Sequence, residues 1–163
     1  MQQKISPFLW YTKEAEEAAK LYASIFPDSR VTRVSALPSD SPSGPAGSVK
    51  VVEFVLFGQP FMAISAGPLD AFNHAVSFVV HCETQAEIDR YWNGFLDAGG
   101  KAEQCGWLKD RYGLYWQIVP RRLGEMMSDP DRTKAKRAAD AMLTMQKFDI
   151  AALEAAYAGK AMR

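Results

Sequence analysis

Residues 74–100 read HAVSFVVHCETQAEIDRYWNGFLDAGG, and they carry the clearest pattern of secondary structure in the chain. Its first part, residues 74–82, is rich in apolar and β-branched side chains and predicts a strand. Thr84 and Glu87 then stand at the spacing of a capping box, which begins a helix. The helix carries one apolar stripe and ends at two glycines; the stripe is Ile88, Tyr91, Trp92, Phe95 and Leu96.

The rest of the chain repeats this order of elements. Before residue 74 we expect a strand at residues 5–11, a helix at 13–26 capped by Thr12, and strands at 31–37, 49–57 and 61–66. After residue 100 we expect strands at 101–105, 107–110 and 114–120. A shift of 70 residues places Glu17 on Glu87, Leu21 on Tyr91, Tyr22 on Trp92 and Ile25 on Phe95. The chain therefore predicts two βαβββ modules, at about residues 4–66 and 74–120.

An irregular loop and a helical tail complete the predicted organisation. Residues 38–48 are rich in Pro, Ser and Gly and predict a mobile loop. Asp129-Pro130 predicts the start of a helix that runs to about residue 146, and Asp149 predicts the cap of a last helix over residues 150–158. We expect one domain over residues 1–122, with residues 123–163 as a helical extension packed on it.

The composition excludes several classes of function. The chain has 19 Lys and Arg against 19 Asp and Glu, so it has no net charge to attract nucleic acid or an anionic membrane. No apolar run is long enough for a signal core or a bilayer span. Cys82 and Cys105 form neither a disulfide framework nor a CxxC metal clip. The sequence therefore predicts a cytoplasmic protein with two reduced thiols and no nucleic-acid or membrane partner.

Three stretches resemble one family: residues 105–120, CGWLKDRYGLYWQIVP, residues 76–80, VSFVV, and residues 85–92, QAEIDRYW. They are similar to the PhnB-like subfamily of the vicinal-oxygen-chelate (glyoxalase, bleomycin resistance and extradiol dioxygenase) superfamily, and the resemblance covers roughly residues 4–158. It implies an α+β fold in which two βαβββ modules build a cup-shaped mixed sheet. It also implies a small-molecule ligand and a homodimer, for which the tail helices offer apolar faces.

Members of this subfamily are often labelled 3-demethylubiquinone-9 3-methyltransferase domains. A nucleotide-type methyltransferase needs a glycine-rich turn from a strand into a helix, where the backbone approaches the cofactor. This chain has no such turn, because Gly99-Gly100 follows a helix instead. We therefore expect no methyltransferase activity.

In metal-using members of the superfamily, His, Glu or Gln ligands come from the first and last strands of each module. The matching positions of the first module are Pro7 and Met62 or Ala63, none of which is a ligand for a hard metal. Those of the second module are His74 and Gln117, and two donors make a poor metal site. The sequence predicts no cofactor and no tightly bound metal, with His74 and Gln117 as weak candidates for a divalent ion.

His74 and Glu53 are the candidate catalytic residues. A histidine without a metal can move a proton near neutral pH, although it can equally be a partly solvated residue at a strand end. Glu53 lies in the apolar stretch of residues 51–57, where a carboxylate must be paired, protonated or facing a wet cavity. The sequence leaves open whether Glu53 is a pocket carboxylate or a member of a structural ion pair.

The candidate pocket residues are Gln117, Tyr115, Trp107 and Cys105, and a small buried thiol is the alternative for Cys105. Asp110-Arg111-Tyr112-Gly113 predicts a hairpin turn. We expect a small organic molecule to bind in the cup without a metal. The alternatives are a metal-dependent lyase or isomerase of the glyoxalase or dioxygenase type that uses His74 and Gln117, and a non-enzymatic structural or sequestering protein. Whether the chain is an enzyme stays open.

Overall fold

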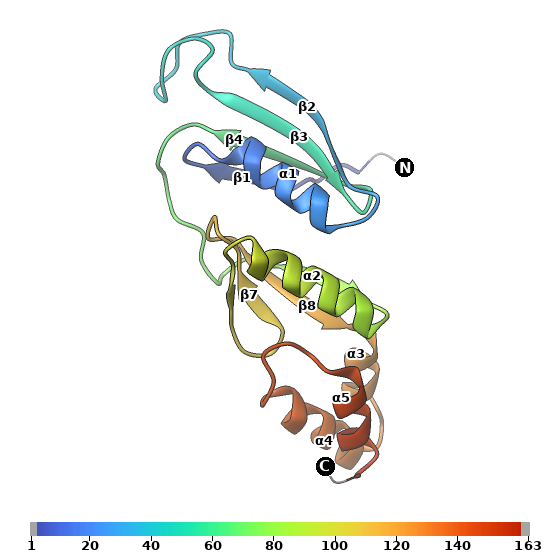
Figure 1. The fold of residues 1–163 in the computed structure, drawn as a ribbon. Helices are drawn as coiled ribbons and strands as arrows, with labels where there is room; N and C mark the ends of the chain where they lie inside the picture. The colour runs from blue at the N-terminus through green and yellow to red at the C-terminus, as the bar shows by residue number, and fades with distance from the viewer. Residues whose placement is uncertain (1–2, 161–163) are drawn as a thin grey trace. The chain divides into compact units, whose positions relative to one another are not determined.

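A computed structural model describes residues 3–160, which form two compact units, with the boundary along the chain between Ala71 and Phe72 (Figure 1). Each unit holds one four-stranded mixed sheet and one long helix, and the second also holds three tail helices. The predicted α+β class with two βαβββ modules is confirmed. None of the described helices is both long enough and apolar enough to cross a membrane.

The first unit contains β1 (Phe8–Tyr11), α1 (Ala15–Ile25), β2 (Arg30–Ala36), β3 (Lys50–Leu56) and β4 (Gln59–Ser65). The strand order is β1-β4-β3-β2, with β1 parallel to β4 and the other pairs antiparallel. Strand residues alternate between a buried face and a less buried one, as the period of two requires. The buried face packs on α1, whose inward residues are Ala15, Ala18, Ala19, Tyr22 and Ile25.

The start of α1 differs from the expectation. Thr12 does not cap the helix; Glu14 is the N-cap residue, and its side chain makes no capping hydrogen bond. The amide of Ala15 instead donates to Oγ of Ser65, at 3.0 Å, from the end of β4. A hydroxyl from a distant strand therefore satisfies a first-turn amide, and the prediction of Thr12 as the cap is wrong.

The second unit contains β5 (Phe78–Cys82), α2 (Gln85–Asp97), β6 (Lys101–Ala102), β7 (Trp107–Lys109) and β8 (Tyr115–Pro120). Its strand order, β5-β8-β7-β6, repeats that of the first unit, again with one parallel pair. The capping box is confirmed: Thr84 Oγ1 accepts from the amide of Glu87, and the Glu87 carboxylate accepts from the amide of Thr84. The strand is shorter than predicted, because pairing begins at Phe78 and residues 74–77 lie outside it.

The tail contains α3 (Arg121–Met127), α4 (Arg132–Met142) and α5 (Ile150–Tyr157). Asp131 caps α4, so the prediction of a start at Asp129-Pro130 is wrong. The reason is that Asp129 is otherwise engaged: its carboxylate accepts from the amide of Asp131 and from the hydroxyl of Tyr157. The predicted cap Asp149 is confirmed for α5.

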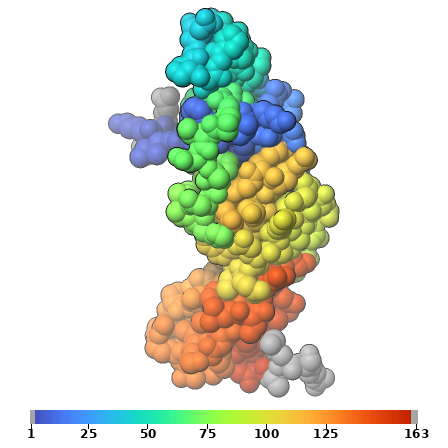
Figure 2. Space-filling view, turned by 90° about the vertical axis from the view of Figure 1, so that its left-hand side faces the viewer, coloured from blue at the N-terminus to red at the C-terminus, as the bar shows by residue number. Residues whose placement is uncertain are grey.

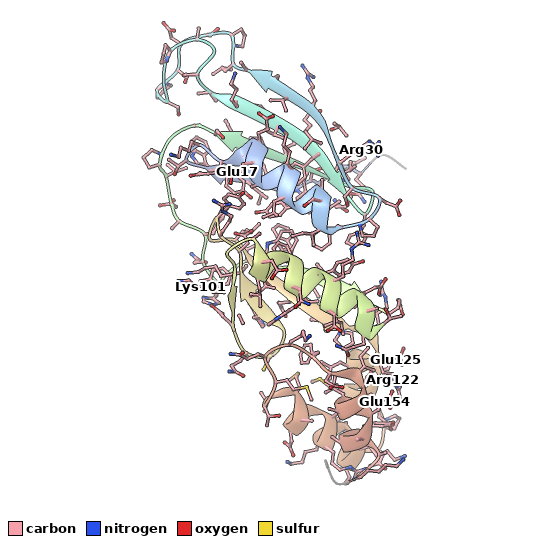
Figure 3. The ribbon with its side chains drawn as sticks, in the orientation of Figure 1. Glu17, Arg30, Lys101, Arg122, Glu125 and Glu154 are labelled. Carbon is pink, nitrogen blue, oxygen red and sulfur yellow. The ribbon has the colours of Figure 1, made fainter. Side chains whose placement is uncertain are left out.

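An ion-pair cluster joins two of the tail helices. Arg122 in α3 places Nε 2.6 Å from Oε1 of Glu154 in α5, and Nη1 3.0 Å from Oε2 of Glu125 (Figure 3). The same guanidinium lies 5.4 Å from the ring centroid of Tyr157. Arg122 therefore contacts α5 in two ways, through an ion pair and through the aromatic ring of Tyr157.

Candidate functional site

One cluster of polar and aromatic side chains lies on a single face of the second sheet. The imidazole of His74 packs on the ring of Tyr115, with 3.9 Å between centroids, and lies 5.9 Å from the indole of Trp107. Its Nε2 is 2.8 Å from Oε2 of Glu103. We call His74, Glu103, Trp107 and Tyr115 the imidazole cluster. Three of its four members were predicted as site residues, and the structure brings those three together.

Strand register explains why these side chains share a face. Trp107 pairs with Gln117, and Lys109 pairs with Tyr115, across the antiparallel β7–β8 hairpin. Intervening residues point the other way, where Leu108, Trp116 and Ile118 are buried. Trp116 there lies 5.0 Å, between ring centroids, from Phe95 of α2. One face of the hairpin therefore builds the core, and the other carries the imidazole cluster.

Gln117 extends the polar part of this face toward β5. Its Nε2 donates to Oγ of Ser77 at 2.9 Å, and its strand partner is Val79, which is 43% exposed. Because Gln117 donates to the hydroxyl, its amide oxygen and the proton of Ser77 are the groups left to face a ligand. The predicted pocket residue Gln117 thus lies beside the imidazole cluster, two residues after Tyr115 and on the same face.

Lysines border the cluster on the other side. Lys109 places Nζ 5.9 Å from the ring centroid of Tyr115, and Lys101, labelled in Figure 3, pairs with Lys109 in the β6–β7 ladder. The carboxylate of Glu103 balances part of this charge. With Nε2 of His74 directed at that carboxylate, Nε2 carries the proton in the neutral ring, and Nδ1 is the basic nitrogen.

Glu53 belongs to the first unit and is half-buried there. On the neighbouring strand, Nη1 of Arg33 lies 3.7 Å from its Oε1, and Arg33 is also its partner in the β2–β3 register. Of the readings left open by the sequence, the paired carboxylate is the one that these contacts favour. A pair this exposed contributes little to folding, about 0–1 kcal/mol.

Cys105 faces the tail. Its thiol donates to the carbonyl of Met142 at 3.7 Å, and its amide donates to the carbonyl of Met145 at 2.7 Å. The residue is partly buried and has a φ of +57°, which is rare for a residue with a side chain. Both thiols of the chain are free, and the other, Cys82, is buried at the end of β5.

Two members of the site were not predicted. Glu103 is separated from His74 by 29 residues, and Ser77 from Gln117 by 40. The available signal for a polar face was the arrangement of Lys101, Glu103 and Trp107 around a tight turn. Their spacing alone does not predict that the side chain of His74 lies on that face.

Two of the positions that were considered as metal ligands are engaged in hydrogen bonds within their own unit. Pro7 uses its carbonyl to accept from the amide of Met62, and Gln117 is engaged with Ser77. Within residues 3–160 no three His, Cys, Asp or Glu side chains are grouped as metal ligands would be. The chemistry that the cluster itself offers is stacking, hydrogen bonding and proton transfer at Nδ1 of His74.

Comparison with known proteins places the chain among relatives that share most of its length. A family model described as 3-demethylubiquinone-9 3-methyltransferase matches residues 3–119. The solved PhnB protein of Bacillus cereus is 33% identical, with a TM-score of 0.64, over 72% of this chain and 99% of that one. No curated protein sequence matches the chain.

Two further solved structures share the fold. Protein PA1353 of Pseudomonas aeruginosa is 21% identical, with a TM-score of 0.55, over 73% of this chain and 98% of that one. The fosfomycin resistance protein FosX of Listeria monocytogenes is 14% identical, with a TM-score of 0.56, over 79% of this chain and 99% of that one. At these identities the likeness concerns the fold alone.

Proposed function

Because the chain belongs to the PhnB-like family that carries the description 3-demethylubiquinone-9 3-methyltransferase, within the vicinal-oxygen-chelate superfamily, we propose that it binds a small organic molecule on the open face of its second sheet, without a tightly bound metal. The observation that carries the proposal is the imidazole cluster. Aromatic rings from β7 and β8 and an imidazole bound to a carboxylate lie side by side on one face of the sheet, where Tyr115 is buried, Trp107 is partly buried and His74 is exposed.

The side chains of this face suit a planar ligand with a polar edge. Trp107 and His74 offer flat surfaces for stacking, each worth about 0.5–1.5 kcal/mol beyond simple burial. The hydroxyl of Ser77 and the ammonium of Lys109 are donors for a carbonyl or carboxylate oxygen. Aromatic carboxylates and phenols combine these two features, so we propose that class of ligand.

The family description does not extend to a methyltransferase mechanism in this chain. Within residues 3–160, the connections from β1 into α1 and from β5 into α2 are residues 12–14 and 83–84, and neither contains glycine. In the second connection Thr84 caps α2, and at the first the amide of Ala15 is bound by Ser65. A cofactor pyrophosphate or nucleoside would need the close backbone approach that glycines allow there.

We also propose a cytoplasmic homodimer. Support comes from apolar side chains left on the surface of the tail, among them Leu143 and Met127, and from the two free thiols. Light scattering at micromolar concentration tests the dimer, and a mass of 18.1 kDa, that of one chain, would contradict it.

Calorimetry and NMR titration test the ligand site, with benzoate, 4-hydroxybenzoate and catechol as probes. Saturable binding is expected for the wild type and at least a tenfold loss, about 1.4 kcal/mol, in Trp107→Ala and His74→Ala. Lys136→Ala is the control, because Lys136 is an exposed residue of α4 that pairs with Asp140 and lies on no strand of the second sheet. Equal losses in Lys136→Ala, or no binding of any probe, would reject the proposed site.

A further inference from the structure

We propose that the C-terminal tail is a positioning element of the ligand site: its loop of residues 142–148 holds the turn of residues 103–107, and that turn holds His74. The family match ends at residue 119, where the tail starts. The PhnB protein of Bacillus cereus aligns over almost its whole length, and this alignment leaves part of the present chain unmatched. The tail is therefore an addition to the shared fold, and its contacts show what it adds.

The loop is bonded to two successive amides of the turn. Cys105 donates its amide to the carbonyl of Met145, and Gly106 donates to the carbonyl of Gln146, both at 2.7 Å. Cys105 and Gly106 have φ values of +57° and +78°, an unusual pair that aims both amides at the tail. A side-chain-bearing residue keeps such a conformation only where its surroundings impose it. Here the loop supplies the two acceptors that do so.

Phe148 fixes the loop against the same turn by packing. Its ring is fully buried, and a methyl group added to Gly106 would meet Cε2 of Phe148 at 2.4 Å. The ring therefore lies directly on the backbone of Gly106, a contact that only glycine permits. The turn is held on the tail side both by hydrogen bonds and by this ring.

Two side chains of α2 anchor the loop. Gln85 donates to the carbonyl of Phe148 and accepts from the amide of Ile150, at 2.9 Å in each case. One helical turn later, Asp89 lies 2.6 Å from Nζ of Lys147. The packing of the tail against the second unit, in orange and red beside yellow, is visible in Figure 2. The loop therefore connects α2 rigidly to the turn.

The turn in its own right supplies half of the imidazole cluster. Glu103 and Trp107 bracket Cys105 and Gly106, and the amide of Glu103 donates to the carbonyl of Trp107 at 2.9 Å. Glu103 holds Nε2 of His74, and Trp107 borders the same ring. A shift of the two central residues would move both contacts of His74. Phe148 is in this sense a positioning residue: it acts on His74 through Gly106 and Glu103.

The test reads the protonated nitrogen of His74 from two-dimensional 1H–15N spectra of the imidazole rings at about pH 8, where neutral histidine predominates. The chain has only two histidines, so His81→Gln assigns the signals. In the wild type, His74 is expected as the Nε2–H form. In Phe148→Ala, as in Glu103→Gln, that preference should be lost and a mixture of the two tautomers should appear.

Leu153→Ala is the matched control, because Leu153 of α5 is as deeply buried as Phe148, whereas the side chain that lies on Gly106 is that of Phe148. It should weaken the tail and leave the His74 signals unchanged. If Phe148→Ala does not fold, Gln85→Ala, which removes the two loop hydrogen bonds from a partly exposed position, gives the same reading.

Unchanged His74 signals in the folded Phe148→Ala or Gln85→Ala protein would overturn the proposal, and so would an equal change in Leu153→Ala. The role in ligand binding rests on the proposed function, but the spectra need no ligand. If no probe binds and the tautomer still responds to Phe148, the proposed ligand fails while the positioning role stands.

Discussion

Trp116 donates its indole N–H to the carboxylate of Asp110, with 3.0 Å between Nε1 and Oδ2, in the interior of the second unit. The other oxygen, Oδ1, accepts from the amides of Tyr112 and Leu114 at 2.9 and 3.0 Å. Among the described residues Asp110 is the one buried charged side chain. The turn that joins β7 to β8, predicted as a hairpin, is confirmed and is organised around this carboxylate.

Asp110→Asn should therefore lower the free energy of unfolding by about 3 kcal/mol. An amide has one acceptor oxygen, so its NH2 group must face either the indole N–H or the two backbone amides. Asp149→Asn is the matched control, because Asp149 is an exposed helix cap and asparagine caps as well as aspartate, so the change should be within about 0.5 kcal/mol. Urea unfolding measures both, and equal losses would contradict the role given to Asp110.

Gly106→Ala should cost about 3 kcal/mol or more, since it combines a strained φ with a clash against Phe148 and the carbonyl of Ile118. Gly58→Ala separates the two effects. Gly58 has nearly the same φ, +76° against +78°, but a methyl group there would meet nothing within 4 Å. Its cost should be about 1–2 kcal/mol, from φ strain alone. Thermal unfolding of both variants measures the difference. Similar unfolding midpoints would mean that the ring of Phe148 moves away from the added methyl group at little cost.

Stability should fall at alkaline pH because of Cys82. Burial, with a smaller effect of Glu87 and Glu83, raises the pKa of this thiol from 9.0 to about 12. The folded state therefore keeps a proton that the unfolded state has lost. The thiol's contribution is fully present below pH 9.0 and is lost between pH 9.0 and about 12, with a slope of about 1.4 kcal/mol per pH unit.

Cys82→Ala should remove that part of the slope, and Cys105→Ala should retain it. Burial also raises the pKa of Tyr91 in all three proteins, and a smaller contribution from the charge of Cys82 is lost in Cys82→Ala. Urea unfolding at a series of pH values measures the slopes. A slope that is unchanged in Cys82→Ala would show that the thiol is not the group responsible.

The protein should retain no tightly bound transition metal after dialysis. His74 has one further good donor beside it, Glu103, and the amide of Gln117 is bound to Ser77, so neither weak candidate belongs to a set of three donors within residues 3–160. Emission spectrometry on tag-free protein measures the content. Near-stoichiometric zinc, iron, nickel or manganese that falls in His74→Ala would return the function to metal-dependent lyase or isomerase chemistry.

S-adenosylmethionine should give no saturable heat at sub-millimolar concentration, because the strand-to-helix connections have no glycine-rich turn. Isothermal calorimetry with the wild-type protein measures this, and a probe that binds the imidazole cluster provides the positive control. Micromolar binding of the cofactor would support the activity named in the family description.

The sequence by itself determined the order of elements. The capping box at Thr84, the apolar stripe of α2 and the repeat between the modules are local patterns, and each is satisfied by neighbours a few residues away. Period and capping act within one element, so they can be interpreted without knowing what packs beside it. Three members of the site were also named from the sequence: His74 from its residue type and its position in the family resemblance, and Trp107 and Tyr115 as aromatic residues that can line a pocket.

The contacts between residues that are distant in the sequence became known only from the tertiary structure. Ser65 replaces Thr12 at the start of α1, Glu103 meets His74, and Phe148 lies on Gly106. Each pair joins residues that are tens of positions apart, and many other polar or aromatic residues of the chain have the same local pattern. Which of them meet is set by how the sheet, α2 and the tail pack together, because a hydrogen bond or a ring contact acts only over a few ångströms in space, whatever the separation along the chain.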